Sequence, residues 1–102
     1  MTGISGERKL PGPEPRRIPI EDRIDLHAFV PKEIPSVVQD YLEEAARAGF
    51  RQVRIIHGRG TGTQRRIVRS VLALHPLVES LSDAPPEAGG WGATVAVLRP
   101  RV

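Results

Sequence analysis

The residues with the clearest chemical potential form a glycine-rich run, HGRGTG, at positions 57–62. The run follows a strand-like apolar segment, Gln52–Ile56, and precedes a segment whose apolar residues recur with helical period. Glycines allow positive φ and close backbone approach, and a helix start offers unpaired N–H groups with a partial positive charge. A strand, a glycine turn and a helix start in that order therefore predict a binding site for an anion.

Three arginines near this turn make a phosphate the favoured anion, because the guanidinium group suits phosphate geometry. The run lacks the Gly-Lys-Ser/Thr ending of a nucleotide P-loop, and no acidic residue follows at the dinucleotide-binding spacing. Neither ATP nor NAD is supported, which leaves the phosphate of a nucleic-acid backbone. The residues predicted to hold it are Gly58, Arg59, Gly60, Thr61, Gly62, Arg65 and Arg66.

One carboxylate and two histidines could add acid–base chemistry. Asp25 and His27 lie two positions apart, and His57 opens the glycine run. A neighbouring carboxylate can fix the tautomer of a histidine, and imidazole moves protons near neutral pH. The catalytic hypothesis is that His27 or His57 deprotonates an attacking water or a ribose 2′-OH, while the other protonates the leaving oxygen. Loop amides and Arg59 would stabilise the charge that develops on the phosphate.

Two other interpretations of these three residues stay open. Asp25 could simply accept hydrogen bonds from loop amides, while His27 could hydrogen-bond across the sheet edge. The three residues could also bind a divalent metal, although a histidine mechanism without metal explains them equally well. No metal ligand is therefore assigned, and a divalent metal is the one cofactor left open.

The elements that must position these residues follow from hydrophobic periodicity. Ile24–His27 alternates apolar and polar residues, so a strand there would place Asp25 and His27 on one face. Pro31 and Pro35 predict an irregular first turn for the helix that follows. Further along the chain we expect a strand at 51–56, a helix at 63–74, a strand at 77–82, a loop at 83–92 and a strand at 94–98.

The resulting order, βαβαββ, predicts an α/β fold of the two-layer α+β sandwich type, with a mixed four-stranded sheet and two helices. Two βα units imply neighbouring parallel strands with right-handed crossovers, and a closing hairpin adds an antiparallel strand. Parallel strands place their C-terminal ends along one edge of the sheet, where open α/β sheets bind ligands. Asp25 and His27 should therefore meet His57 and the glycine run at that edge.

Composition narrows the class of protein further. Aromatic residues make up only 4% of the chain against 39% hydrophobic residues, so the core must be aliphatic, and an RNA-recognition sheet with stacked aromatics is disfavoured. Trp91, in the loop at 83–92, could stack a base or pack as a lid. The absence of cysteine excludes disulfides, thiolate zinc sites and cysteine nucleophiles. Neither a signal-peptide core nor an apolar run of spanning length is present, which favours a cytoplasmic protein with no membrane partner.

The N-terminal residues differ from the rest of the chain. Residues 1–17 combine scattered charge with repeated glycine and proline, a composition that cannot bury enough surface to offset its ordering entropy. We expect a flexible tail at 1–17 and one folded domain at 18–102.

Three ordered motifs resemble the Smr (small MutS-related) domain family. The segment IDLHAF resembles the family's LDLHG, IIHGRGTG resembles its IHGKGTG, and GGWGATVAVL resembles its GG-x-GATVV run. Together they extend from Ile24 to about Arg99. The family's Asp and His fall on Asp25 and His27, and its second His falls on His57. One position departs from the pattern, because Ala28 replaces the glycine that follows LDLH in the family.

The resemblance implies a fold similar to the C-terminal domain of translation initiation factor three. It also implies endonuclease activity, either nicking of DNA or cleavage of RNA, and hence a role in DNA repair or recombination or in ribosome quality control. The tail and the lack of an ATPase module suggest a stand-alone protein. Two alternatives stay open: a module that binds DNA or RNA without cutting it, and a ribosome-associated adaptor that uses the tail and the basic second helix.

Overall fold

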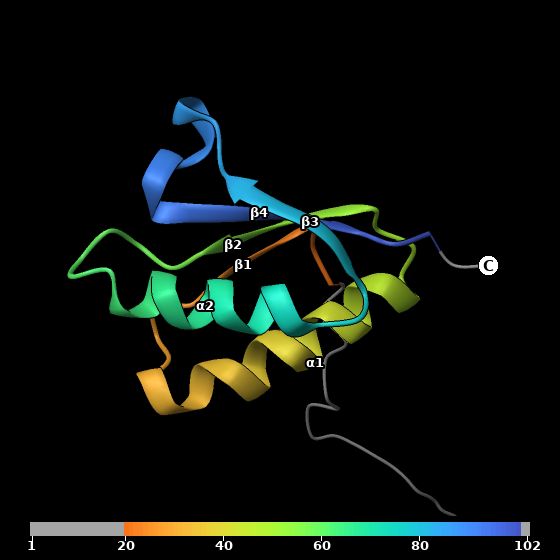
Figure 1. Ribbon diagram of the computed structural model, residues 1–102, viewed down its shortest axis with the longest axis horizontal. Coiled ribbons are helices and arrows are strands. Elements are labelled where there is room, and N and C mark those ends of the chain that lie inside the picture. The colour runs from red at the N-terminus through yellow and green to blue at the C-terminus, as the bar shows by residue number, and fades with distance from the viewer. Residues whose placement is uncertain (1–19, 101–102) are drawn as a thin grey trace, which may run out of the picture.

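The computed structural model describes residues 20–100, which fold into two layers, a four-stranded sheet and a pair of helices on one of its faces (Figure 1). The strands are β1 (Arg23–Asp25), β2 (Gln52–Ile56), β3 (Val78–Asp83) and β4 (Ala93–Leu98), and the helices are α1 (Ile34–Arg47) and α2 (Thr63–Leu74). Single 3-10 turns lie at η2 (Pro31–Glu33), η3 (Pro86–Ala88) and η4 (Gly90–Gly92). The predicted fold class is confirmed. The predicted tail at 1–17 lies outside the described residues.

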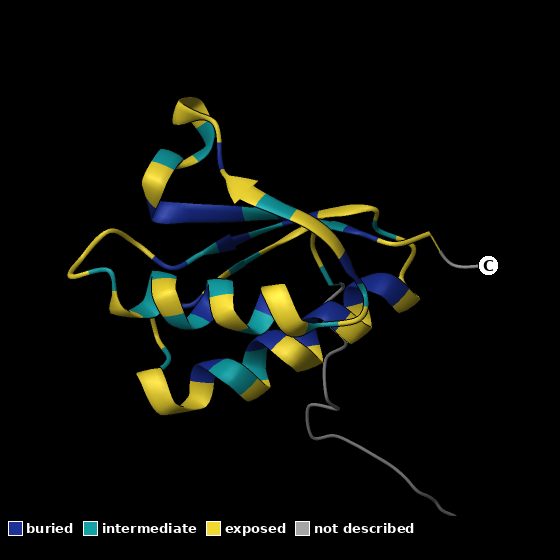
Figure 2. Cartoon of the chain, in the orientation of Figure 1, coloured by how far each residue is buried: buried dark blue, intermediate teal, exposed yellow. Residues whose placement is uncertain are grey.

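The strand order is β1-β2-β4-β3, which differs from the predicted arrangement in one respect. β1 and β2 are parallel neighbours as expected, but β4 lies between β2 and β3 and is antiparallel to both. β3 is therefore an edge strand and has no pairing with β2. The exchange has a physical reason: β4 is almost wholly apolar and buried, whereas β3 is mostly exposed and suits an edge (Figure 2).

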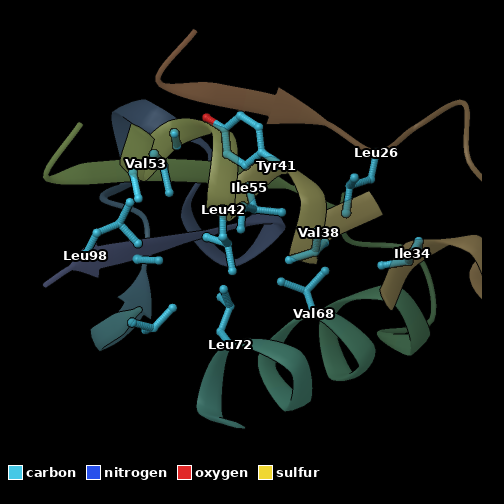
Figure 3. Close-up of a cluster of buried hydrophobic side chains, with 14 residues drawn as sticks. Leu26, Ile34, Val38, Tyr41, Leu42, Val53, Ile55, Val68, Leu72 and Leu98 are labelled. Atoms are coloured by element: carbon cyan, nitrogen blue, oxygen red, sulfur yellow. The ribbon is translucent and has the colours of Figure 1, made fainter. Parts of the chain in front are cut away.

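The core lies between the sheet and the helices and is aliphatic, as composition requires. Its fully buried side chains come from both helices, from β2 and β4, and from the segment after β1 (Figure 3). Among these core residues are Leu26, Ile34, Val38, Leu42, Val53, Ile55, Val68, Leu72 and Leu98. Tyr41 adds the one buried aromatic ring of this cluster, and its hydroxyl donates to the Glu21 carbonyl at 2.6 Å. Burial raises the pKa of that hydroxyl.

The two helices begin where the prolines and glycines of the sequence place them. The turn η2 precedes α1, which confirms the irregular start expected from Pro31 and Pro35. α2 starts directly after Gly62 and ends before His75-Pro76, because the residue before a proline avoids the α region. No helix within residues 20–100 is long and apolar enough to cross a membrane.

The first strand is shorter than predicted. β1 ends at Asp25, whose Oδ1 accepts the backbone N–H of His27 at 2.9 Å. The chain then turns, and the N–H of Phe29 donates to the Leu26 carbonyl at 3.0 Å. His27 therefore lies in a turn and not on the strand, so the predicted strand face shared by Asp25 and His27 does not exist. The short polar side chain of aspartate competes with the sheet for the next amides, which is its usual behaviour in turns.

Candidate functional site

An open pocket of about 410 Å³ lies where β1 and β2 end. Topology brings together here the two segments that the sequence keeps apart, because parallel β1 and β2 finish at the same edge. The pocket is lined by Asp25, His27, Ile56, His57, Gly58, Arg59, Gly60, Thr61, Gly62, Thr63 and Gln64. All predicted site residues except Arg65 and Arg66 are in this set, and Ala28 is outside it.

The glycine loop, residues 57–62, holds its shape through positive φ angles and contacts with β4. Gly58, Gly60 and Gly62 have φ of 81°, 37° and 88°, which only glycine adopts readily. The amides of His57 and Gly58 both donate to the Gly92 carbonyl, at 3.1 and 2.8 Å. Within the described part of the chain, the amides of Arg59, Gly60 and Thr61 have no acceptor. Residues 58–61 of the loop are exposed (Figure 2).

The start of α2 continues this row of free donors. Gly62 is the N-cap residue and offers no side chain as a cap, and within residues 20–100 the amides of Gln64 and Arg65 have no acceptor. The Gln64 side chain donates instead to the Phe29 carbonyl at 3.4 Å, which links α2 to the turn after β1. An uncapped helix start carries a partial positive charge, so the pocket wall favours an anion.

His27 and Asp25 also line the pocket. The His27 side chain is exposed, and no residue of the described chain hydrogen-bonds its ring. One carboxylate oxygen of Asp25 accepts the His27 amide, which is the interpretation in which Asp25 serves a loop amide. The carboxylate thus fixes the path of the turn that carries His27. It does not hydrogen-bond the imidazole itself.

His57 has a different environment from the one a proton-transfer group needs. It is buried, with Nδ1 2.9 Å from the Gly58 carbonyl oxygen and Nε2 2.9 Å from the Thr94 hydroxyl. Because a carbonyl can only accept, Nδ1 carries the proton and Nε2 accepts from Thr94. Burial lowers the pKa of His57, and the charges of Arg65 and Arg69 act in the same direction. Both ring nitrogens have partners inside the protein, and the bond to Thr94 links the loop to β4.

This environment predicts that stability depends on pH. The pKa of His57 in the folded protein lies below its value of about 6.5 in the unfolded chain, so the unfolded chain is protonated first as pH falls. The contribution of His57 to the free energy of unfolding is therefore fully present above about pH 6.5. It is lost as pH drops below that value. The slope should reach at most about 1.4 kcal/mol per pH unit. Urea unfolding between pH 5 and 7.5 measures it. His57→Gln should remove this contribution and His75→Asn should keep it; an unchanged slope in His57→Gln would contradict the assignment.

The three arginines predicted to bind phosphate have different surroundings in the structure. Arg65 donates to Asp83 Oδ1 at 2.8 Å, and its guanidinium lies over the Trp91 ring, 4.9 Å from the centroid. The Arg59 side chain extends over the loop before β4, where a Cβ added at Gly92 would lie 3.3 Å from Arg59 Cγ. Arg66 remains exposed, with no ion pair in the part of the chain that the structure describes.

Asp83 is the residue that sequence reasoning missed here. At the end of β3 it accepts from Arg65 and from Arg69, at 2.8 and 2.9 Å. The hydrogen bond from Arg65 is the main cause that holds the pKa of the Asp83 carboxyl below its ordinary value. Thr94 was missed as well. The sequence around these two residues does not indicate their contacts, because their partners lie on other elements of the fold.

No metal site forms from these side chains. Within residues 20–100 there is no group of three or more His, Cys, Asp or Glu side chains close enough to hold a metal ion. The idea that Asp25, His27 and His57 together ligate a divalent metal therefore has no supporting geometry.

Comparison with known proteins gives the class to which this fold and this pocket belong. The family model for the Smr domain matches residues 24–99. The chain therefore belongs to the Smr domain family, as its three motifs suggested.

Its relatives include endonuclease MutS2 of Thermus thermophilus, 43% identical over 77 residues, which are 76% of this chain and 10% of that protein. The crystal structure of the Smr domain of Thermus thermophilus MutS2 has a TM-score of 0.73 and 42% identity, and the match covers 76% of this chain and 98% of that one. YdaL, a stand-alone small MutS-related protein from Escherichia coli, has a TM-score of 0.68 and 31% identity over 79% of this chain and 66% of that one. The chain spans about a tenth of the length of the MutS2 relatives that it matches.

Proposed function

We propose that this Smr domain binds nucleic acid by a backbone phosphate in the pocket at the ends of β1 and β2, and that it cleaves the phosphodiester bond there. One observation carries the proposal. A single pocket gathers His27 with the glycine loop and the start of α2, where the amides of Arg59, Gly60, Thr61 and Gln64 have no acceptor in the described chain. Relatives named endonuclease MutS2 contain the same domain, which supports this chemistry.

The phosphate is bound mainly by backbone. Free N–H groups are available on two elements, the glycine loop and the start of α2. Charge-assisted hydrogen bonds to a phosphate oxygen are stronger than neutral ones. Because the glycines carry no Cβ, a phosphate can approach the loop closely. No added Cβ at Gly58 or Gly60 would meet an atom within 4 Å, so the loop borders open space.

The outer face of α2 extends the electropositive surface beyond the pocket. A shallow groove there is lined by Gly62, Arg65, Arg66, Arg69, Ser70 and Ala73. Asp83 offsets part of the charge of Arg65 and Arg69, but one carboxylate faces two guanidiniums, and Arg66 has no such partner among residues 20–100. The nucleic-acid strand on either side of the bound phosphate can therefore run along this face of α2.

His27 is the residue that moves a proton in this proposal, because its ring nitrogens are open to the pocket while those of His57 are occupied. A water oxygen, or a ribose 2′-OH in RNA, attacks phosphorus, and the bond to the opposite ribose oxygen breaks. His27 takes the proton of the nucleophile, and water in the open pocket supplies one to the leaving oxygen. The free amides stabilise the additional negative charge of the transition state.

The alternative is a module that binds nucleic acid and does not cut it. Two observations favour it: His57 uses both ring nitrogens internally, and Asp25 bonds a backbone amide instead of an imidazole. In that case the same loop holds phosphate, but no proton is transferred.

Incubation with substrate separates the two. The full chain is mixed with labelled single-stranded RNA or supercoiled DNA, with and without EDTA, and products are resolved on gels while binding is followed by anisotropy. The proposal predicts salt-sensitive binding and cleavage. Binding without cleavage under all conditions would leave the module, and the absence of binding to either nucleic acid would overturn both.

Arg66 provides a test of the electropositive face. Arg66→Gln should weaken binding and reduce the slope of log affinity against log salt by about one ion, since each neutralised phosphate releases about 0.9 counterions in duplex DNA and about 0.7 in single strands. Arg47→Gln, at the far end of α1, removes an equal charge and should leave the slope unchanged. Equal effects of the two substitutions would mean that affinity depends on the net charge of the protein and not on a contact at Arg66.

A further inference from the structure

Trp91 is an exposed aromatic residue next to the candidate phosphate site. Its side chain is 41% exposed and lies outside the buried core. Trp91 does not line the pocket itself, but its ring lies beside Gly62, which does. The exposed part of the indole offers a flat aromatic surface on which a planar ligand can pack.

The ring is held in place beside the loop. A Cβ added at Gly62, the N-cap of α2, would lie 3.4 Å from the outermost carbon of the six-membered ring, Cη2. The Arg65 guanidinium lies over the ring, 4.9 Å from its centroid, and is itself fixed by Asp83. Trp91 thus needs little further ordering to receive a ligand, which lowers the entropic cost of binding.

The loop that carries Trp91 is anchored at two points. Arg54 donates to the Ala88 carbonyl at 3.2 Å, and the Gly92 carbonyl accepts from the glycine loop. Figure 1 shows this loop, between β3 and β4, at the same end of the sheet as the glycine loop. Arg59 links the two, since an added Cβ at Gly90 would lie 3.3 Å from its terminal nitrogen Nη2.

We propose that the exposed surface of Trp91 stacks on the base of an unpaired nucleotide whose phosphate is bound at the glycine loop, so that this domain selects single-stranded nucleic acid. Every base has a π face, so the stack adds affinity without sequence preference. In a duplex the bases are stacked on each other, and reaching Trp91 would require unstacking and unpairing. This inference rests on the proposed phosphate site and adds the class of substrate.

The test uses intrinsic fluorescence, because Trp91 is the only tryptophan of the chain. The full chain is titrated with a labelled single strand, with the same strand paired to its complement, and with a strand of equal length that carries abasic sites. His27→Ala protein prevents cleavage during the titration. Anisotropy of the label measures binding, and quenching of the indole reports stacking.

The base-containing strand should quench Trp91 and bind about 5- to 100-fold more tightly than the abasic strand. Trp91→Leu should abolish that difference, whereas Trp91→Phe should keep most of it. Thermal unfolding is used to check that both variants fold. Equal binding of base-containing and abasic strands, or tighter binding of the duplex, would overturn the inference while leaving the phosphate site intact. The absence of binding to all three probes would overturn the proposed function itself.

Discussion

Replacing His27 by alanine should slow cleavage of the phosphodiester bond by about 10²- to 10⁴-fold, the usual contribution of a general acid–base group. Binding should change little, because the amides of the loop and of α2 hold the phosphate in this account. The fold should be intact as well, since His27 is exposed and its ring makes no hydrogen bond to any described residue. Single-turnover cleavage and anisotropy on the same preparation measure the two quantities separately.

A second histidine supplies the matched control. His75 lies at the end of α2, where its Nδ1 accepts the Leu77 amide at 3.1 Å, and it does not line the pocket. His75→Asn should cleave at the rate of the original chain. If His27→Ala cleaves as fast as His75→Asn, the proton transfer assigned to His27 is wrong.

Placing a valine at Gly60 should weaken nucleic-acid binding by about 10- to 100-fold, because each hydrogen bond to a charged group contributes about 1.5–3 kcal/mol and the loop can no longer aim its amides together. The backbone of Gly60 has φ of 37°, which a β-branched residue avoids. Apart from its two chain neighbours, no atom lies within 4 Å of an added Cβ, so the strain is local to the backbone and not a clash with another part of the fold.

Gly49 offers a control with the same local properties. It follows α1, has φ of 93°, and also has no atom within 4 Å of an added Cβ. Both Gly60→Val and Gly49→Val should lose about 1–2 kcal/mol of stability from backbone strain. Only Gly60→Val should lose affinity. A similar loss of binding in Gly49→Val would show that the effect comes from general destabilisation and not from the loop.

The features that could be predicted from sequence are those set by local pattern. Helical periodicity and the break at His75-Pro76 placed α2 at Thr63–Leu74, and the two prolines placed the irregular start of α1. The meeting of Asp25 and His27 with the glycine loop followed from the parallel pairing of β1 and β2 alone.

The features that could not be predicted depend on partners distant in sequence. The central position of β4 is chosen by burial among strands, not by connection length. The motif around His57 is the same whether its ring nitrogens face solvent or are hydrogen-bonded. Only the fold brings Thr94 to its ring. Nothing in the local sequence around Arg65 indicates its ion pair with Asp83, eighteen positions away.

The central claim is that backbone amides of one loop and one helix start hold the phosphate. Amide chemical-shift mapping by heteronuclear NMR, during titration of the full chain with a short single-stranded oligonucleotide, tests it most directly. The account predicts the largest shifts at the free amides of Arg59, Gly60, Thr61, Gln64 and Arg65. Saturable shifts confined to α1 or to the open face of the sheet, with these five amides unmoved, would contradict it.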